Sequence, residues 1–475
     1  ALVDPEKEET KKIVEDLKNQ GYQLNLNLCS EESFKKAINL YKEHEYKEEI
    51  KVETKVDVAK LETYEKEIKN LTKLGEKLRD MPVAEVLNLI NLGAVKVGAS
   101  DAHLHPTENG AELRFRIDGV LQKIFEIDSD VFGQLATQIK HDAKLKINVG
   151  NIPQDGEYNF LFNERKIDVR VSTLPTEFGE SFVMRFLDPE EVLLEFEQLG
   201  FEGGNLKKIQ KATRLPYGLV LATGPTGSGK TTTLYTILRK LDTPENKIVT
   251  LEDPIEYHLP EIAQSEVDEA DDYSFSMGLK AILRQDPDII MIGEIRDTES
   301  AEAATQAALT GHVVLSTLHT NNVVEALPRL VNMGVKPFVL APAITLIIAQ
   351  RLVRKVCDKC GEKKKITTSE KEEIAKILEE IKKVDSSIKA EVPAELPQAK
   401  GCDECSHTGY KGRICISEVL EVDEEMRELI LKEASEKEFF AKAREKGFTT
   451  MKEDGILKVI AGVTTLLEVY RVEGE

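Results

Sequence analysis

The segment from Gly224 to Thr231 restricts the possible folds of this 475-residue chain more than any other part of it. It reads GPTGSGKT, which fits the pattern G-x-x-x-x-G-K-[ST]. An apolar run at 217–223 precedes it, and a segment with apolar residues at helical spacing follows at 230–241. Glycines let the backbone N–H groups of such a loop approach phosphate oxygens, and the N-terminus of the next helix adds a positive field. A glycine-rich turn formed by chance is the alternative, and the flanking strand and helix argue against it.

We therefore expect this loop to bind the phosphates of a nucleotide. Lys230 should reach the β- and γ-phosphates, and Thr231 should ligate Mg²⁺. The predicted nucleotide-binding residues are Gly224, Pro225, Thr226, Gly227, Ser228, Gly229, Lys230, Thr231 and Thr232.

Acidic residues follow two further apolar runs of the predicted parallel sheet. The run at 289–292 is followed by Glu294, and the run at 248–251 by Glu252, with Glu256 four residues further on. A carboxylate at such a strand end can hold Mg²⁺ with its water shell or activate an attacking water. Asp is usual at the position of Glu294. We predict that Glu294 is catalytic and binds Mg²⁺ and that Glu252 and Glu256 are catalytic, although helix capping or a surface role explains either of the last two nearly as well.

Two histidines flank a short apolar strand expected at 313–315. His319 lies at the end that should face the nucleotide, where a hydrogen bond to the γ-phosphate would let the strand sense hydrolysis. His312 lies at the other end and is a weaker candidate. Because a lone histidine is more often structural than catalytic, the role predicted for His319 competes with that simpler explanation.

Two Cys-x-x-Cys pairs predict a metal site. Cys357 and Cys360 form the first pair, and Cys402 and Cys405 form the second. Two tight turns that each offer two thiolates suit a closed tetrahedral Zn²⁺ site, which has no open position for chemistry. An iron–sulfur cluster is the minor alternative, and four unrelated reduced thiols are another. The remaining cysteines, Cys29 and Cys415, are expected to be buried apolar residues rather than ligands.

Composition and charge limit the class of protein. Acidic residues outnumber basic ones by 85 to 64, for a formal net charge of −21, so non-specific nucleic-acid binding is not expected. The most apolar stretch, 337–349, is too short to span a bilayer and contains Pro342. The N-terminus has no apolar signal segment, and six cysteines in this length do not suggest a secreted disulfide scaffold. A cytoplasmic location is therefore expected.

The remaining patterns divide the chain into regions of different structure. The Lys- and Glu-rich residues 1–80 suggest helices at 30–46, capped by Ser30, and at 62–78. A helix from Pro82 and two alternating hairpins, at 111–127 and 166–188, suggest a small α+β domain. From Gly203 the pattern becomes that of a parallel α/β core, and the segment between the two cysteine pairs, with a charged helix at 369–384, is expected to be an insertion.

Four motifs in a fixed order resemble those of one family. GPTGSGKTTTLY, TLEDPIEY, LRQDPDIIMIGEIRD and TGHVVLSTLHTN are similar to the Walker A, Asp-box, Walker B and His-box motifs of secretion-superfamily ATPases of the GspE and PilB type. VGASDAHLHP, LRFRIDGVL, IPQDGEYNF and DVRVSTLPTEFGESFVMRFLD resemble that family's second N-terminal domain. The resemblance covers residues 81 to about 475.

This resemblance implies a RecA-like P-loop NTPase core with a mainly parallel sheet, preceded by a small PAS-like α+β domain. It also implies ATP, Mg²⁺ and Zn²⁺ as cofactors. The implied protein is a homohexameric cytoplasmic ATPase, peripheral at the inner membrane through partners, that assembles a type IV pilus or a type II secretion pseudopilus through an inner-membrane platform protein. The family's assembly members have the four cysteines, whereas its retraction motors lack them.

The expected divisions follow from the resemblance and from the patterns above. They are a helical remnant of a partner-binding domain at 1–52, a linker helix at 53–80, the α+β domain at 81–190, the ATPase core at 191–356, the tetracysteine subdomain at 357–415 and a helical C-terminal part of the ATPase domain at 416–475.

Arginines outside the phosphate-loop core acquire a role by this resemblance. Arg114, Arg116, Arg170 and Arg185 lie in the small domain, and some of them should reach a γ-phosphate across a domain or subunit interface. We favour Arg114 and Arg116, which alternate onto one face of a strand. Surface ion pairs are the simpler explanation for all four.

The small domain also departs from the family pattern. Glu157 stands where the family usually has Arg, and Ala102 and His105 stand where Ile and Glu are common.

Two other functions remain open at this point. A P-loop ATPase of a DNA-uptake or DNA-transfer machine is the main alternative, but the sequence has no basic stripe with interleaved aromatic residues. A nucleotide-switched scaffold without turnover is the third, and the joint presence of Lys230, Thr231 and Glu294 argues against it.

Overall fold

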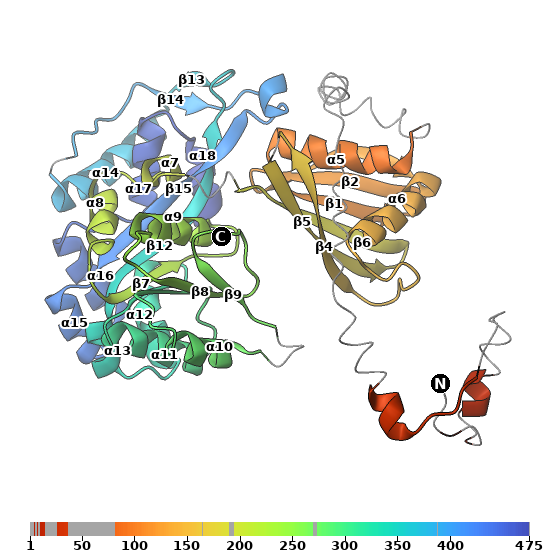
Figure 1. Cartoon of the computed structure of the whole chain (residues 1–475). Coiled ribbons are helices and arrows are strands. Elements are labelled where there is room, and N and C mark those ends of the chain that lie inside the picture. Colours follow the sequence, from red (N-terminus) through yellow and green to blue (C-terminus); the bar gives the residue numbers. More distant parts are fainter. Residues whose placement is uncertain are drawn as a thin grey trace. The chain divides into compact units, whose positions relative to one another are not determined.

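A computed structural model describes residues 4, 7, 10–14, 26–36, 81–163, 165–189, 194–268, 273–386 and 388–474 (Figure 1). The chain divides into two units, residues 1–53 and residues 54–475. In the first unit, residues 10–14 and 31–36 are helical, and the backbone N–H of Ser33 donates to Ser30 Oγ at 3.1 Å. The helix predicted at 30–46 is therefore present from Ser30 as far as residue 36. Its remainder and the helix predicted at 62–78 lie outside the described residues.

The second unit begins with a six-stranded antiparallel sheet in the order β3-β2-β1-β6-β5-β4. Its elements are α5 (Val83–Val97), β1 (Ala99–Thr107), β2 (Gly110–Ile117), β3 (Val120–Asp128), α6 (Ser129–Asp142), β4 (Gln154–Phe162), β5 (Arg165–Thr176) and β6 (Gly179–Leu187). Helices α5 and α6 pack on each other and on one face of this sheet (Figure 1). Alternate strand residues such as Ala102, Leu113 and Phe115 are buried beneath the helices, while the residues between them face the opposite side.

Both hairpins predicted in this domain are present. Strands β2 and β3 are joined at Asp118–Gly119, where both residues have positive φ, and β5 pairs with β6 in the same antiparallel way. Turns of this kind favour Asp-Gly because glycine has no Cβ to clash at positive φ.

A seven-stranded sheet forms the core of the rest of the chain, in the order β15-β12-β7-β11-β10-β8-β9. Its strands are β7 (Gly218–Thr223), β8 (Ile248–Glu252), β9 (Ala263–Glu266), β10 (Ile289–Ile292), β11 (Val313–Leu318), β12 (Ile344–Val356) and β15 (Tyr410–Glu421). All neighbours pair in parallel except β12 and β15, which are antiparallel. The expected mixed α/β fold with a mainly parallel sheet is confirmed.

Helices cover both faces of this sheet (Figure 1). They are α7 (Phe196–Leu199), α8 (Gly203–Ala212), α9 (Lys230–Leu241), α10 (Phe275–Ile282), α11 (Thr298–Leu309), α12 (Val323–Asn332), α13 (Pro337–Ala343), α14 (Thr368–Val384), α15 (Glu424–Leu431), α16 (Glu436–Glu445), α17 (Met451–Ile460) and α18 (Leu466–Glu473). Because side chains alternate along a strand, Leu219 and Leu221 of β7 belong to one hydrophobic cluster and Val220 and Ala222 to the other. Full burial on both faces explains the continuous apolar runs of these strands.

The segment between the two cysteine pairs forms a small layer of its own. Strands β13 (Glu362–Lys365) and β14 (Glu395–Gln398) pair in antiparallel fashion, and α14 packs against α17 in a cluster that includes Ile374, Ile381 and Ile456. The division expected between residues 415 and 416 falls inside β15, which continues from this region into the core sheet. None of the described helices is long and apolar enough to cross a membrane.

Candidate nucleotide site and tetracysteine centre

The phosphate loop joins the end of β7 to the start of α9. Gly224 and Gly229 have φ angles of 142° and 86°, a region that residues with a Cβ seldom adopt. A Cβ on Gly224 would also lie 2.5 Å from the carbonyl oxygen of Gln350. Lys230 is buried, and its Nζ donates to the carbonyl oxygens of Gly224 at 2.9 Å and Pro225 at 3.1 Å. Burial lowers the pKa of this ammonium group to about 8.

A glutamine that the sequence analysis missed supports this loop. Gln350, in β12, donates from Nε2 to the carbonyl oxygen of Ser228 at 2.7 Å and accepts from Thr233 Oγ1 at 2.8 Å. The loop and the first turn of α9 are thus held by one buried amide. No local pattern could have identified Gln350, because its partners are more than a hundred residues away in the sequence.

Glu294 and His319 come together at the carboxyl ends of adjacent parallel strands. Glu294 follows β10 and His319 follows β11, and His319 Nε2 lies 3.2 Å from Glu294 Oε2. Burial lowers the pKa of His319, with a further contribution from the charges of Lys230 and Arg296. Arg296 also contacts Glu294, and it donates to Asp253 Oδ2 at 3.0 Å. Arg296 was not among the residues predicted for this site.

The other two predicted acids have different surroundings. Glu252 is buried, and its carboxylate accepts hydrogen bonds from Thr250 Oγ1 at 2.6 Å, from Gln264 Nε2 at 3.2 Å and from the hydroxyl of Tyr235. Burial raises the pKa of Glu252 despite these donors. Glu256 is half-buried and lies 3.3 Å from Arg170 Nη1.

The four predicted arginines lie on the sheet face opposite α5 and α6. Strand register places Arg116 opposite Asp101, Asp101 opposite Arg185, and Arg185 opposite Arg170. Arg114 lies two residues from Arg116 and contacts Glu112. Arg170 also contacts the carbonyl oxygen of Ile255, beside Glu256, so it connects the small domain to the segment that carries two predicted acids.

The chain's departure at Glu157 lies in the same row of the sheet, because Glu157 is the register partner of Arg170. The row of arginines therefore ends at an acid where the family pattern has another arginine.

The histidine at the other end of β11 has structural contacts. His312 Nδ1 lies 2.9 Å from the carbonyl oxygen of Ala307 and 3.1 Å from Thr310 Oγ1. It precedes the strand, whereas Glu294 and the phosphate loop lie where the parallel strands end. The structural interpretation thus suits His312.

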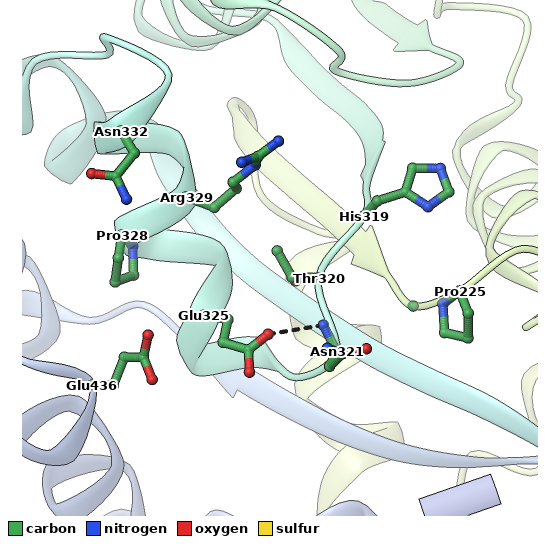
Figure 2. A pocket seen from close by; sticks show the side chains of 10 residues that line it. Pro225, His319, Thr320, Asn321, Glu325, Pro328, Arg329, Asn332 and Glu436 are labelled. Atoms are coloured by element: carbon green, nitrogen blue, oxygen red, sulfur yellow. Dashed lines mark hydrogen bonds between the residues drawn. The ribbon is translucent and has the colours of Figure 1, made fainter. Parts of the chain in front are cut away.

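A polar cavity of about 530 Å³ opens beside the phosphate loop (Figure 2). Gly224 and Pro225 line it on the loop side, and His319 and the two residues after it line it from the segment that follows β11. Thr320 Oγ1 donates to Thr223 Oγ1 at 3.0 Å, and Asn321 N donates to Glu325 Oε2 at 3.1 Å. These bonds join the His319 segment both to the end of β7 and to α12.

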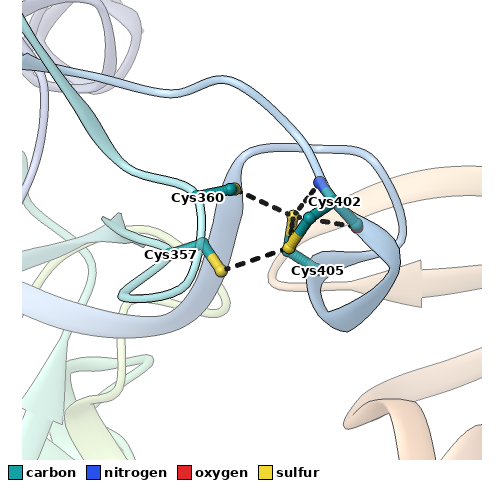
Figure 3. Close-up of side chains that lie close together, drawn as sticks. All are labelled: Cys357, Cys360, Cys402 and Cys405. Atoms are coloured by element: carbon teal, nitrogen blue, oxygen red, sulfur yellow. Dashed lines mark hydrogen bonds between the residues drawn. The ribbon is translucent and has the colours of Figure 1, made fainter.

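The four paired cysteines converge (Figure 3). Their sulfurs lie within 4.8 Å of one another, with separations of 3.9 Å for Cys357–Cys402 and 3.7 Å for both Cys360–Cys405 and Cys402–Cys405. Four thiolates about 2.3 Å from one Zn²⁺ ion in a tetrahedron are about 3.8 Å apart, so this geometry fits the metal.

Backbone N–H groups also point at two of these sulfurs, as expected for thiolates. Gly401 N donates to Cys360 Sγ at 3.3 Å, and Cys402 N and Gly409 N donate to Cys405 Sγ at 3.2 Å each. Cys415 is buried in β15, outside this cluster, and Cys29 is partly exposed.

Comparisons with known proteins agree with one another. The family model described as type II/IV secretion system protein matches residues 76–471. Type II secretion system protein E of Pseudomonas aeruginosa is 44% identical over 400 residues, which are 84% of this chain and 77% of that protein. Type IV pilus assembly ATPase PilB of Thermus thermophilus is 42% identical over 372 residues, which are 78% of this chain and 41% of that protein.

Two solved structures have a similar fold. The ATPase DotB of Legionella pneumophila has a TM-score of 0.59 at 23% identity, over 82% of this chain and 95% of DotB. The pilus retraction motor PilT, solved with bound ADP, has a TM-score of 0.54 at 25% identity, over 81% of this chain and 96% of PilT.

Proposed function

This chain belongs to the type II/IV secretion system protein family and hydrolyses ATP, and we propose that its phosphate loop and Glu294 use this reaction to drive type II secretion or type IV pilus assembly. The observation that carries the proposal is the position of Glu294. This acid follows β10, and it lies beside His319 in the parallel sheet from which the phosphate loop also emerges. None of the relatives reported above is named as a DNA-handling protein.

The residues of the site have separate roles in hydrolysis. Lys230 and the loop N–H groups bind the β- and γ-phosphates, while Thr231 and Glu294 hold Mg²⁺, which neutralises phosphate charge when bound. Glu294 orients the attacking water or accepts its proton. His319, which lies next to Glu294, would sense loss of the γ-phosphate.

The arginine row, which consists of Arg116, Arg185 and Arg170, couples hydrolysis to movement of the small domain. Guanidinium groups that contact the γ-phosphate stabilise the charge that develops in the transition state, an effect worth about 10³ to 10⁵ in rate for arginine fingers. Arg170 supports such a role, because it already contacts the segment at Ile255 and Glu256. Loss of the γ-phosphate would remove this attraction, so that the small domain and the core can move apart.

The same proposal covers the partners and the metal. We infer that the chain works as a homohexamer at the cytoplasmic face of the inner membrane and acts on a platform protein, with no direct contact to nucleic acid. The four cysteines would hold Zn²⁺ as a structural ion, because a closed set of four thiolates leaves no position for a substrate.

The proposal is tested with Glu294→Gln, which keeps the side-chain size and removes the charge. ATP turnover of the purified chain should fall by about 10² to 10⁴, while the affinity for a fluorescent ATP analogue changes little. Glu302→Gln, an exposed substitution on α11, is the matched control and should turn over at the wild-type rate. Turnover by Glu294→Gln within about twofold of wild type would refute the role given to this acid.

A further inference from the structure

One buried carboxylate lies beneath two of the four arginines, and nothing in the proposed reaction yet uses it. We propose that Asp101 is a positioning residue, which holds Arg116 and Arg185 in the orientation that meets the nucleotide phosphates. The inference rests on the proposed function, since it gives these two arginines a role in hydrolysis.

The contacts of Asp101 account for both of its oxygens. Arg185 Nε donates to Oδ1 at 2.9 Å, Ser100 Oγ donates to Oδ2 at 2.8 Å, and Arg116 Nε lies 3.6 Å from Oδ2. The Asp101 side chain is only 6% exposed, whereas those of Arg116 and Arg185 are 36% and 53% exposed. The acid is thus fixed inside the sheet, and the guanidinium groups extend from it towards the surface.

The atoms used in these contacts leave the rest of each guanidinium available. Asp101 engages both arginines at Nε, the inner nitrogen, and Arg116 Nη1 donates to the carbonyl oxygen of Gly119 at 3.1 Å. Among the described residues, the terminal nitrogens of Arg185 have no hydrogen-bond partner. A guanidinium has five N–H donors in a rigid fork, so an acceptor at Nε fixes its plane while its terminal N–H groups can meet a phosphate.

Electrostatics gives a second reason for this acid. The register places Arg116, Arg185 and Arg170 in one row across three strand pairs, with Asp101 between the first two. Like charges that face each other in a sheet repel, and a carboxylate between them lowers the cost of keeping them parallel. The remaining two arginines have separate partners, because Arg114 contacts Glu112 and Arg170 contacts Glu256. Among the described residues, Arg116 and Arg185 are the two of these arginines that contact the same carboxylate.

The test is Asp101→Asn in the full chain, compared with Arg185→Ala and with the double variant. Asp101→Asn should lower kcat by roughly 10 to 100-fold, because misplaced groups contribute little to the transition state, and change the Kd of a fluorescent ATP analogue by less than about threefold. In the Arg185→Ala background, Asp101→Asn should lower kcat less than it does in wild type, because only its effect on Arg116 remains. Asp101→Glu, which keeps the charge, should recover part of kcat.

Glu180→Gln is the matched control. It removes the carboxylate that pairs with Lys140 Nζ at 2.5 Å in the same domain, away from the arginine row, so it should leave kcat unchanged. Thermal unfolding of every variant separates loss of folding from loss of positioning. If Asp101→Asn does not fold, Asp101→Glu still decides the matter, because a lengthened acid should alter kcat and leave the analogue Kd intact.

The outcomes distinguish this inference from the function on which it rests. If neither Arg185→Ala nor Arg116→Ala slows turnover, the arginine part of the proposed function is wrong, and the role of Asp101 falls with it. Arg185→Ala could slow turnover while Asp101→Asn does not, or the two reductions in kcat could multiply in full in the double variant. In either case the arginines keep their role in hydrolysis, and Asp101 is not their positioning residue.

Discussion

The carboxylate of Glu252 is enclosed by three donors, and these surroundings decide what it can do. Glu252 is only 2% exposed, and Thr250, Gln264 and Tyr235 all donate to it, so little of its carboxylate is accessible to water. The Glu294 side chain is 19% exposed, which favours Glu294 as the acid that meets water first. Glu252 instead connects β8 to α9, the helix that follows the phosphate loop, through the Tyr235 hydroxyl.

Replacing Tyr235 should therefore weaken the fold of the core. Tyr235→Phe keeps the ring but leaves one oxygen of a buried carboxylate without a donor, which costs about 1 to 3 kcal/mol. Urea unfolding measures the loss, and Tyr217→Phe, at a 54% exposed position before β7, is the control. Equal stability of Tyr235→Phe and wild type would show that the hydroxyl contributes nothing to this connection.

At the scale of helices and strands, the local sequence predicted much of the core. The apolar run at 289–292 coincides with β10, and the helical spacing at 230–241 coincides with α9, because a strand buried on both faces and a helix with one buried face leave clear local patterns. The same patterns predicted that Glu294 and His319 each follow a strand of the parallel sheet. Their contact depends on the pairing of β10 with β11, which was not predicted.

The remaining contacts depend on pairings that no local pattern records. Strand β15 was divided between two predicted regions, because its partner β12 ends before the inserted segment begins. The contacts made by three residues became visible only in the assembled fold: Gln350, Arg296 and Asp101. Their residue types are common on any surface. Strand pairing gives Gln350 and Asp101 their contacts, and it brings Asp253, which follows β8, to Arg296, which follows β10.

An ion-pair cluster that joins β12 to α18 should make stability depend on pH. Although burial opposes ionisation, Arg354 and Arg471 lower the pKa of Glu468 to about 2. Arg354 Nη2 donates to Glu468 Oε1 at 2.6 Å. Since the folded pKa lies below the ordinary value of 4.5, the stabilisation is complete above pH 4.5 and is lost as the pH falls towards 2.

Glu468→Gln tests this pH dependence. The variant should be less stable than wild type by about 2 kcal/mol at pH 7, and the difference should shrink below pH 4.5. Denaturant unfolding at pH 7, 4.5 and 3.5 measures it. Glu428→Gln, which breaks an exposed pair with Lys432, should change stability little at any pH. A difference that stays constant down to pH 3.5 would contradict the assignment.

For the whole molecule, the tetracysteine centre closes an excursion of the chain that leaves the core sheet after β12 and returns at β15. The two cysteine pairs bring the ends of this excursion together, and α14, which lies between them in the sequence, packs against α17. Loss of the metal should therefore loosen residues between the two cysteine pairs, while the sheet that carries the phosphate loop stays folded.

Metal removal provides the measurement. A chromophoric chelator should release about one Zn²⁺ per chain, and Cys402→Ser should bind none under the same conditions. The stripped protein should be cut faster by protease between residues 360 and 402, with a lower Tm and a nearly unchanged affinity for an ATP analogue. Cys415→Ser is the control, because this buried thiol lies outside the cluster. Full metal content in Cys402→Ser would exclude the four-cysteine site.

Strand β12 has a mechanical consequence for the molecule as a whole. Gln350 of this strand donates a hydrogen bond to the phosphate loop. Cys357 follows seven residues later, about 23 Å away along an extended backbone. Paired on one side with β7 and on the other with β15, this strand stretches very little under load. Tension applied at the two cysteine pairs would therefore reach the backbone that encloses the phosphates.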